Sequence, residues 1–183
     1  MALSKIDTQA LVADAVGNTI LDLSENYAFS GTVTGAGGGK VLNTEFNSNA
    51  TPVVSSDTTA WKVSVSKTIT PSATSSKIII NAMLSVDLYA SQRVDMEAKL
   101  RRAITGGATT DFAPARYSTL HGTGTLYPYL YGTFPLTWED SPSTTSEITY
   151  SIIFRRASTS GTIYSSRGNA PGTSSICLTE VGV

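Results

Sequence analysis

The sequence predicts an all-β protein, an antiparallel β-sandwich or barrel, preceded by a short N-terminal helix and an extended segment. Three observations predict this fold. Apolar and polar residues alternate in several runs after residue 59, turn-rich stretches separate these runs, and no helical period lies between them. The composition agrees, because only 15% of the 183 residues are charged, which disfavours long surface helices.

A short helix is expected at residues 4–16, "SKIDTQALVADAV". Ser4 can cap its first turn, with Asp7 three residues further on. The residues that fall on one helical face are Ile6, Ala10, Ala13 and Val16. Because so short a helix is unstable alone in water, we expect it to pack against its own domain or against copies of itself. An extended segment follows at residues 18–35.

The glycine run "TGAGGGK" at residues 34–40 resembles a phosphate-binding loop in composition but not in spacing. A P-loop ending in Gly39 and Lys40 would need glycine at Thr34 and a hydroxyl residue at Val41. The dinucleotide-binding pattern also fails, since its third glycine would fall on Lys40.

We therefore interpret the glycine run as a hinge, because glycine is tolerated best where the chain must turn freely. The hinge residues are Gly35, Gly37, Gly38 and Gly39. This interpretation divides the chain into an N-terminal attachment and trimerisation segment at residues 1–50 and a β-sandwich head at residues 51–183.

Strand periodicity is clear from residue 59 onward. In the first run, Trp61, Val63, Val65 and Ile69 share the apolar face, and the run at residues 77–90 repeats the pattern. The run at residues 93–104 has good helix propensity, but its apolar residues align only at a period of two. We therefore expect a strand there, because the pattern outweighs propensity.

The second half of the chain begins with a long loop at residues 105–125, rich in glycine and threonine. Strands are then expected at residues 126–140, 147–158, 161–168 and 174–183. A tyrosine ladder, Tyr127, Tyr129 and Tyr131, lies on one face of the first of these strands. Such rings either stack on sugars or line a contact between sheets or subunits, and the sequence favours packing.

The composition excludes several functional classes. The net charge is −1 and no basic stripe occurs, so nucleic acid is not an expected partner. No apolar run is long enough to insert in a membrane. The single cysteine, Cys177, precludes an intrachain disulfide and is interpreted as a packed side chain. We expect no cofactor and no metal site.

Catalytic residues are equally sparse, so the chain is not expected to be an enzyme. The single histidine, His121, lies in a glycine-flanked loop, which is a poor place for a catalytic triad. Glu139 and Asp140 are the nearest candidates for a carboxylate pair acting on glycans. A solvated strand end before a Ser-Pro turn explains them better. Candidate surface-contact residues are Trp138, Arg155 and Arg167.

Most of the chain resembles fibre-like structural proteins of tailed bacteriophages, particularly marine and cyanobacterial phages. The C-terminal β-sandwich heads of those proteins are similar to "TWEDSPSTTSEITYSIIFRRASTSGTIYSSRG" and "SSICLTEVGV", and their repeated leads are similar to "NTILDLSENYAFSGTVTGAGG". Such heads resemble the tumour-necrosis-factor and C1q jelly rolls, which are usually trimers. The resemblance therefore implies a jelly-roll-like head, a homotrimer and a virion location.

The expected function is a tail fibre or spike that docks on other virion proteins by its N-terminal segment and meets a host surface glycan or protein through its head. Repeated weak contacts would give avidity. A capsid decoration or head-fibre protein is the main alternative, since the long shaft usual in such fibres is missing. A glycan depolymerase and a cytokine-like binding module remain as further alternatives.

Overall fold

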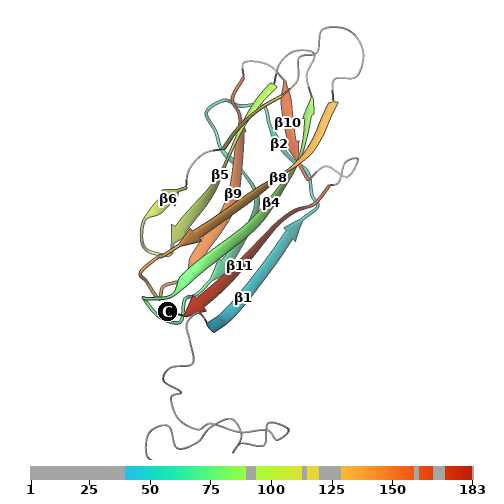
Figure 1. The fold of residues 1–183 in the computed structure, drawn as a ribbon. Coiled ribbons are helices and arrows are strands. Elements are labelled where there is room, and N and C mark those ends of the chain that lie inside the picture. The colour runs from blue at the N-terminus through green and yellow to red at the C-terminus, as the bar shows by residue number, and fades with distance from the viewer. Residues whose placement is uncertain are drawn as a thin grey trace, which may run out of the picture. The chain divides into compact units, whose positions relative to one another are not determined.

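The computed structural model describes residues 40–89, 94–112, 115–119, 129–158, 161–166 and 172–182, with the backbone alone at 89, 115–119, 129 and 130. These residues form an all-β fold (Figure 1). The strands are β1 (Lys40–Asn49), β2 (Val53–Ser55), β3 (Lys62–Ile69), β4 (Lys77–Tyr89), β5 (Val94–Ile104), β6 (Thr109–Asp111), β7 (Ala115–Thr119), β8 (Tyr129–Asp140), β9 (Ile148–Arg156), β10 (Thr162–Ser165) and β11 (Ser174–Gly182).

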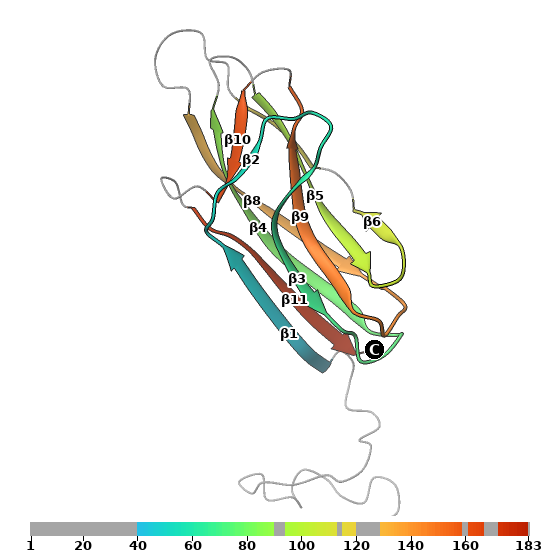
Figure 2. The same ribbon diagram turned by 180° about the vertical axis from the view of Figure 1, so that it is seen from behind.

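The strands form two antiparallel sheets. Sheet A has the order β1-β11-β4-β10-β2, and β8 pairs with the other edge of β4. Sheet B has the order β3-β9-β5-β6, and β7 also pairs with β5. Figure 1 shows sheet A in front, and the reverse view in Figure 2 shows β3, β9 and β5 of sheet B in front.

The connectivity is that of a jelly roll. Beginning at β3, the chain passes from one sheet to the other at most connections, whereas β5 to β7 stay together in sheet B and β10 and β11 both lie in sheet A. β10 and β11 pair with successive parts of β4, so each sheet is in effect four strands wide. The predicted all-β, jelly-roll-like sandwich is thereby confirmed for the described residues.

The core lies between the sheets and follows the predicted period of two. Even-numbered residues of β4 point inward, and most are completely buried: Ile78, Ile80, Leu84 and Leu88. Val94, Met96 and Ala98 of β5 are also fully buried, which confirms the strand prediction for this run. β9 contributes Ile148, Tyr150, Ile152 and Phe154, each with no exposed surface.

Two predicted inward positions of this run are wrong. Trp61, just before β3, lies on the outward side of sheet B against Lys99 and Arg155. Val63 was expected to share the apolar face of β3, but its side chain is 49% exposed, whereas Ser64 is buried. The register of β3 against β9 shifts between Val63 and Val65. An extra residue in one strand reverses the side-chain alternation, so the bulge turns Val63 outward while Val65 stays in the core.

Several short strands were not predicted. β6 and β7 lie inside the stretch expected to be a long loop, and β2 precedes β3. Residues 40–49, which the sequence analysis placed in the N-terminal segment, form β1 and pair along their length with β11. The N-terminal helix, with Ile6, Ala10 and Ala13, and the hinge, with Gly35, Gly37, Gly38 and Gly39, lie outside the described residues.

Candidate functional site

The two outward faces of the sandwich differ in chemistry. The strand register shows which side chains share a face, because directly paired residues point the same way. On sheet A the outward side chains include five of the eight exposed large hydrophobic residues of the described chain: Val41, Phe46, Val54, Met83 and Tyr131. We call this surface the sheet A face.

Charged groups are few on the sheet A face. Within the described ranges, those that point outward from its paired strands are Lys77, Glu139 and Asp87. Lys77 and Glu139 neutralise each other, with Nζ 2.6 Å from Oε1. Asp87 is only 1% exposed. Since unpaired exposed charge is scarce there, the face can be covered by another protein surface without a large desolvation cost.

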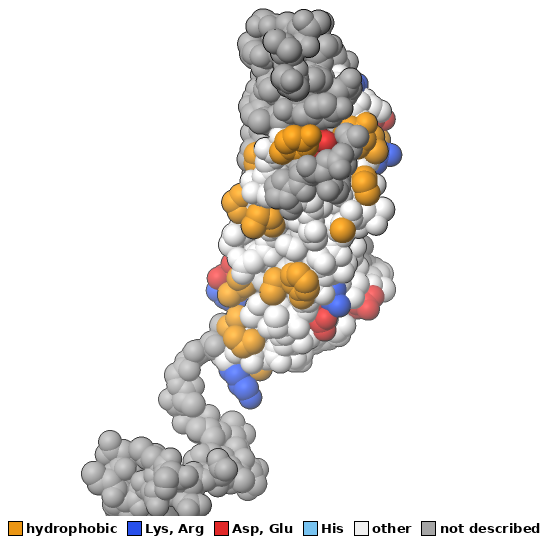
Figure 3. Space-filling model, turned by 90° about the vertical axis from the view of Figure 1, so that its right-hand side faces the viewer, with side chains coloured by type: hydrophobic (Ala, Val, Ile, Leu, Met, Phe, Trp, Pro, Cys, Tyr) orange, Lys and Arg blue, Asp and Glu red, His pale blue; other side chains and the backbone are white. Residues whose placement is uncertain are grey.

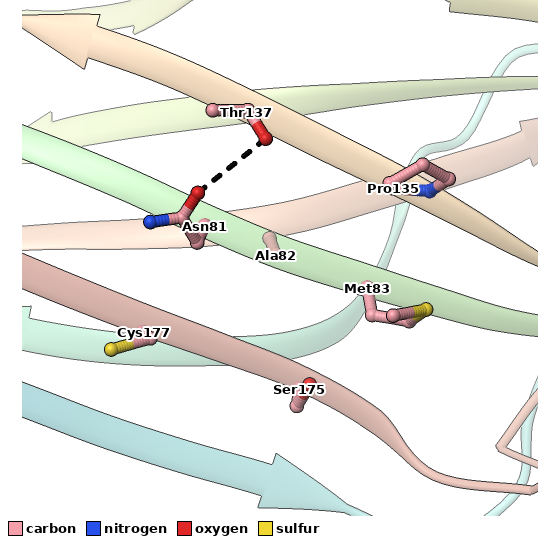
Figure 4. Close-up of a pocket in the computed structure, with 7 residues that line it drawn as sticks. All are labelled: Asn81, Ala82, Met83, Pro135, Thr137, Ser175 and Cys177. Carbon is pink, nitrogen blue, oxygen red and sulfur yellow. Dashed lines mark hydrogen bonds between the residues drawn. The ribbon is translucent and has the colours of Figure 1, made fainter.

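The middle of the sheet A face contains a shallow hollow of ≈ 370 Å³. Its lining comes from three neighbouring strands, β8, β4 and β11 (Figure 4). The lining residues are Asn81, Ala82, Met83, Pro135, Thr137, Ser175 and Cys177, none of which is charged. Thr137 donates its hydroxyl toward the Asn81 amide oxygen at 3.5 Å, a long hydrogen bond.

The edge of the sandwich beside β1 is shown in Figure 3, where hydrophobic side chains form separate patches among mainly white polar surface. Phe46 of β1 is the most exposed large hydrophobic residue of the described chain, at 60%. It pairs directly with Cys177 of β11, so its ring projects from the sheet A face beside the hollow. Isolated exposed apolar residues are common, but an apolar group next to a hollow fits a contact site.

The outward face of sheet B, by contrast, is ionic. Arg155 donates from Nε and Nη2 to one oxygen of Glu97, at 2.8 and 2.6 Å. Arg101 binds both carboxylate oxygens of Asp111, at 2.6 and 3.0 Å. This ion pair lowers the pKa of Asp111, chiefly through the Arg101 hydrogen bond.

Trp61, just before β3, is held on the sheet B face by two cations. Lys99 Nζ lies 4.4 Å from the ring centroid and Arg155 Cζ lies 4.6 Å from it. Ile153 of β9 points to the same face and has no exposed surface. The Trp61 ring is therefore engaged in structural contacts rather than presented freely for stacking on a sugar.

The two candidate carboxylates point to opposite sides of β8. Asp140 faces the interior, where Arg102 Nη1 binds its two oxygens at 2.8 and 2.9 Å and the Tyr150 hydroxyl donates to Oδ2 at 2.6 Å. Glu139 faces outward and pairs with Lys77. The expectation of a solvated strand end is therefore right for Glu139 and wrong for Asp140, which is 7% exposed.

The surface-contact candidates are not brought together. Trp138 points inward at the rim and stacks on Phe112, with ring centroids 5.4 Å apart and 40% of the residue exposed. Arg155 belongs to the sheet B face. Of the tyrosine ladder, Tyr131 is 45% exposed on the sheet A face, whereas the Tyr127 and Tyr129 side chains lie outside the described part. Arg167 and His121 also lie outside it.

Sequence reasoning missed Phe46 and the hollow. Phe46 lies close to the glycine run and was not recognised as part of a strand, because the residues on both sides of it are all polar and show no alternation. Cys177 was interpreted as a packed side chain, and it is half-buried in the wall of the hollow. Adjacent strands in space are distant in sequence here, so no local pattern could have assembled the lining.

The part of the chain that the structure describes contains no group of three histidine, cysteine, aspartate or glutamate side chains that could hold a metal ion. Over the same ranges, no helix is long and apolar enough to cross a membrane.

No family model matches the chain, and no curated protein matches it. Similar solved structures include the infectious bursal disease virus Gx strain (15% identity, TM-score 0.38), the VP2 subviral particle of that virus (11%, 0.38) and T=1 particles derived from it (13%, 0.39).

These three matches cover 76%, 77% and 77% of this chain. They cover only 38%, 40% and 39% of the virus chains, so this chain spans well under half of their length. At these TM-scores the likeness does not carry an argument about function.

Proposed function

We propose that this chain is a virion structural protein, a homotrimeric tail fibre or spike. Its N-terminal segment docks on other virion proteins, and its β-sandwich head contacts the host surface. The observation that carries the proposal is the contrast between the two faces of the head: the sheet A face has most of the exposed large hydrophobic residues and few charges, whereas the sheet B face is ionic. A face with exposed hydrophobic residues and few charges suits contact between copies, and an ionic face suits water.

The resemblance to phage fibre heads supports the same proposal, because those heads share the jelly-roll-like sandwich that this chain adopts. The proposal assigns no catalytic step to the chain. Asp140, one of the two candidate acids, is bound by Arg102 and Tyr150, so a catalytic role would require breaking these contacts.

The first test is the native mass of the purified protein, measured for the full chain and for a variant lacking residues 1–39. We expect a trimer for the full chain. Loss of the trimer on truncation would assign trimerisation to the N-terminal segment, whereas a trimeric truncated protein would assign it to the head. A full-length monomer over the micromolar range would contradict the proposed assembly.

A competition experiment tests the host-contact role. Purified protein added to a susceptible culture before the phage should slow adsorption, because it occupies the host surface. Protein that labels the phage shell and leaves adsorption unchanged would contradict the fibre role and support the capsid decoration alternative. Heat-unfolded protein at the same concentration is the control.

The glycine run is proposed to act mechanically. Replacing Gly37, Gly38 and Gly39 with alanine restricts the backbone, so we expect changed assembly or a changed head orientation in electron micrographs of the particles. Loss of nucleotide binding with unchanged assembly would contradict this role and indicate a phosphate-binding loop.

A further inference from the structure

Arg156, the last residue of β9, is a cation for which the described part of the chain provides no anion. Arg101, Arg102 and Arg155 each form an ion pair with a carboxylate. The Arg156 guanidinium instead donates from Nη1 to the backbone carbonyl of Gly161, at 2.6 Å. Its Nε is buried and has no hydrogen-bond partner within the described ranges. A buried polar atom without a partner is rare in folded proteins, and an ion that binds there is one explanation.

The open edge of the Arg156 guanidinium is the edge that binds carboxylates elsewhere in the head. Arg101 uses Nε and Nη2 to bind the two oxygens of Asp111, at 2.6 and 3.0 Å. Arg155 uses the same two nitrogens to bind one oxygen of Glu97. In Arg156 the backbone carbonyl occupies Nη1, and no described residue accepts a bond from Nε or Nη2. Two parallel N–H groups on one edge match the two oxygens of a carboxylate.

The carboxylates on the neighbouring strands point away from Arg156. Arg156 pairs with Met96, a fully buried residue of β5, so its side chain points between the sheets. Asp95 and Glu97, on either side of Met96, belong to the outward side of sheet B. Asp87 of β4 points outward from sheet A. These orientations favour an anion that comes from another molecule.

Arg156 lies at the end of the head opposite to the one at which the chain enters it. The chain enters β1 at Lys40, beside the last residues of β11. β11 ends beside Lys77, the first residue of β4, whereas Tyr89, the last residue of β4, pairs with the first residue of β10. Arg156 bonds to the residue just before β10. The 13 residues of β4 separate the two ends by roughly 40 Å (Figure 1).

The sequence at this end supplies hydroxyl groups rather than acids. The connections between the strand ends contain no aspartate or glutamate at residues 90–93, 120–128 and 157–161. Ser55 Oγ accepts a hydrogen bond from the Arg156 backbone N–H at 3.4 Å, and Thr162 follows Gly161 directly. A single cation beside neutral hydroxyls matches an acidic sugar, which carries one carboxylate and several hydroxyls. An acidic peptide segment, with several negative charges, matches a group of cations instead.

We propose that Arg156 binds the carboxylate of an acidic sugar on the host surface. Nε and Nη2 donate to the two carboxylate oxygens, while the bond from Nη1 to Gly161 holds the plane of the guanidinium. The inference rests on the proposed host contact of the head and names the chemical group that the host supplies. Docking through the N-terminal segment leaves the end with Arg156 for this contact.

Binding to the surface polysaccharide of a susceptible host tests the proposal. The full-length protein is titrated with the polysaccharide as extracted and after chemical reduction of its carboxylates to alcohols. Reduction removes the anion and keeps the sugar hydroxyls, so we expect the affinity to fall at least about tenfold. Equal affinities for the two preparations would overturn the proposal.

Variants of Arg156 connect this effect to one side chain. Arg156→Gln should bind the untreated polysaccharide at least about tenfold more weakly, and carboxylate reduction should then make no further difference. Arg156→Lys keeps the charge but loses the two-nitrogen edge, so its affinity should lie between those of the Gln variant and the unmodified protein. Unmodified affinity in either variant would overturn the proposal, and the Lys variant decides the result where the Gln variant does not fold.

The matched control is Lys62→Gln. Lys62 is exposed on β3 and pairs with Phe154 near the same end, so this variant removes one positive charge without touching the proposed site. Its affinity should change by less than about twofold. Equal losses for Lys62→Gln and Arg156→Gln would overturn the proposal, because they would indicate a general effect of net charge.

Phage adsorption distinguishes failure of this inference from failure of the proposed function. An Arg156→Gln protein that slows adsorption as well as the unmodified protein keeps the host contact and overturns the role of Arg156. Unmodified protein that does not slow adsorption at all removes both. Binding to host cells that protease treatment abolishes, without binding to the extracted polysaccharide, would overturn the acidic sugar and indicate an acidic protein.

Discussion

At the residue scale, Asp140 illustrates how one carboxylate can join the two sheets. It comes from β8 of sheet A and accepts hydrogen bonds from Arg102 and Tyr150, which belong to sheet B. With 8% of its side chain exposed, it relies on these partners in place of water. Phe112 stacks on both Tyr150 and Trp138 and covers this end of the interior.

Asp140→Asn should therefore destabilise the fold strongly. The substitution keeps the shape but leaves the Arg102 charge, whose side chain is only 16% exposed, without its negative partner, which costs about 3–5 kcal/mol. For a chain of this length, each kcal/mol corresponds to roughly 2–4 °C in Tm, so thermal unfolding should shift by about 6–20 °C. Glu139→Gln is the matched control at the adjacent exposed position, with an expected change within about 1 kcal/mol. Similar shifts for both variants would contradict the assignment.

Tyr150 gives a second prediction for the same group of residues. Burial, followed by the hydrogen bond and negative charge of Asp140, raises the pKa of its hydroxyl far above the ordinary value of a tyrosine. The neutral hydroxyl stabilises the fold at neutral pH, and this contribution is lost as the pH rises past the ordinary tyrosine pKa, about 10.

In an alkaline titration followed by tyrosinate absorbance, Tyr150 should therefore ionise only when the protein unfolds. Tyr150→Phe should leave the absorbance change of the folded protein unaltered and reduce only the change that accompanies unfolding. A smaller absorbance change before unfolding would contradict the prediction.

At the scale of strands, β1 closes the sandwich along one edge. Asn47 and Asn49 reach from sheet A to sheet B and donate to the backbone carbonyls of Ser66 and Ser64, each at 2.8 Å. These bonds satisfy acceptors on the free edge of β3. An unpaired sheet edge invites pairing with another chain, so the two asparagines also protect the head from edge-to-edge association.

The double variant Asn47→Ala and Asn49→Ala should lose about 2 kcal/mol or more of unfolding free energy, at about 1 kcal/mol for each hydrogen bond to β3, because Asn49 also bonds with the backbone of Thr51. Ser48→Ala, between them on the exposed side of the strand, is the control and should change the free energy by less than about 0.5 kcal/mol. Urea unfolding measures all three proteins. A double variant as stable as the control would show that these bonds contribute nothing.

The predictability of the strands depended on their length and burial. β4, β5 and β9 could be predicted because each has a long run with one buried side, which makes the period of two visible. β2 and β6 are three residues long, too short to show a period. β1 was not predicted because its inward residues, Glu45, Asn47 and Asn49, are polar. Their side chains bind β3 of the other sheet instead of packing in the core.

The candidate site was less predictable than the fold. The hollow is assembled from β4, β8 and β11, which become neighbours only through the jelly-roll connections. Asp140 was misjudged because its two partners come from β5 and β9 of the other sheet. Long-range pairing of this kind leaves no local signal in the sequence.

At the scale of the whole head, the two sheets face each other with opposite charges. One cross-strand row of sheet B carries Lys67, Tyr150 and Arg102 side by side. Lys67 meets Glu45 of sheet A at 2.9 Å, and Arg102 meets Asp140 of sheet A at 2.8 Å. The two ion pairs thus lie on either side of Tyr150. One joins β1 to β3 and the other joins β8 to β5, so each connects the two sheets at one edge of the sandwich.

Acid should weaken two ion pairs of the head, Lys67–Glu45 between the sheets and Arg101–Asp111 on the outward side of sheet B. The pKa of Glu45 is lowered, chiefly by its hydrogen bond from Lys67, and the pKa of Asp111 is lowered, chiefly by its hydrogen bond from Arg101. A carboxylate whose pKa is lower in the folded state stabilises the fold fully above its ordinary pKa, about 4. This contribution is lost as the pH falls through the folded-state value.

The double variant Glu45→Gln and Asp111→Asn tests this pH dependence. Because neither of these two ion pairs can titrate in the variant, its urea midpoint should fall less between pH 5 and pH 3 than that of the unmodified protein. At pH 7 the variant should be the less stable of the two, and the difference should shrink at pH 3. Parallel pH profiles would show that acid does not act through these two ion pairs.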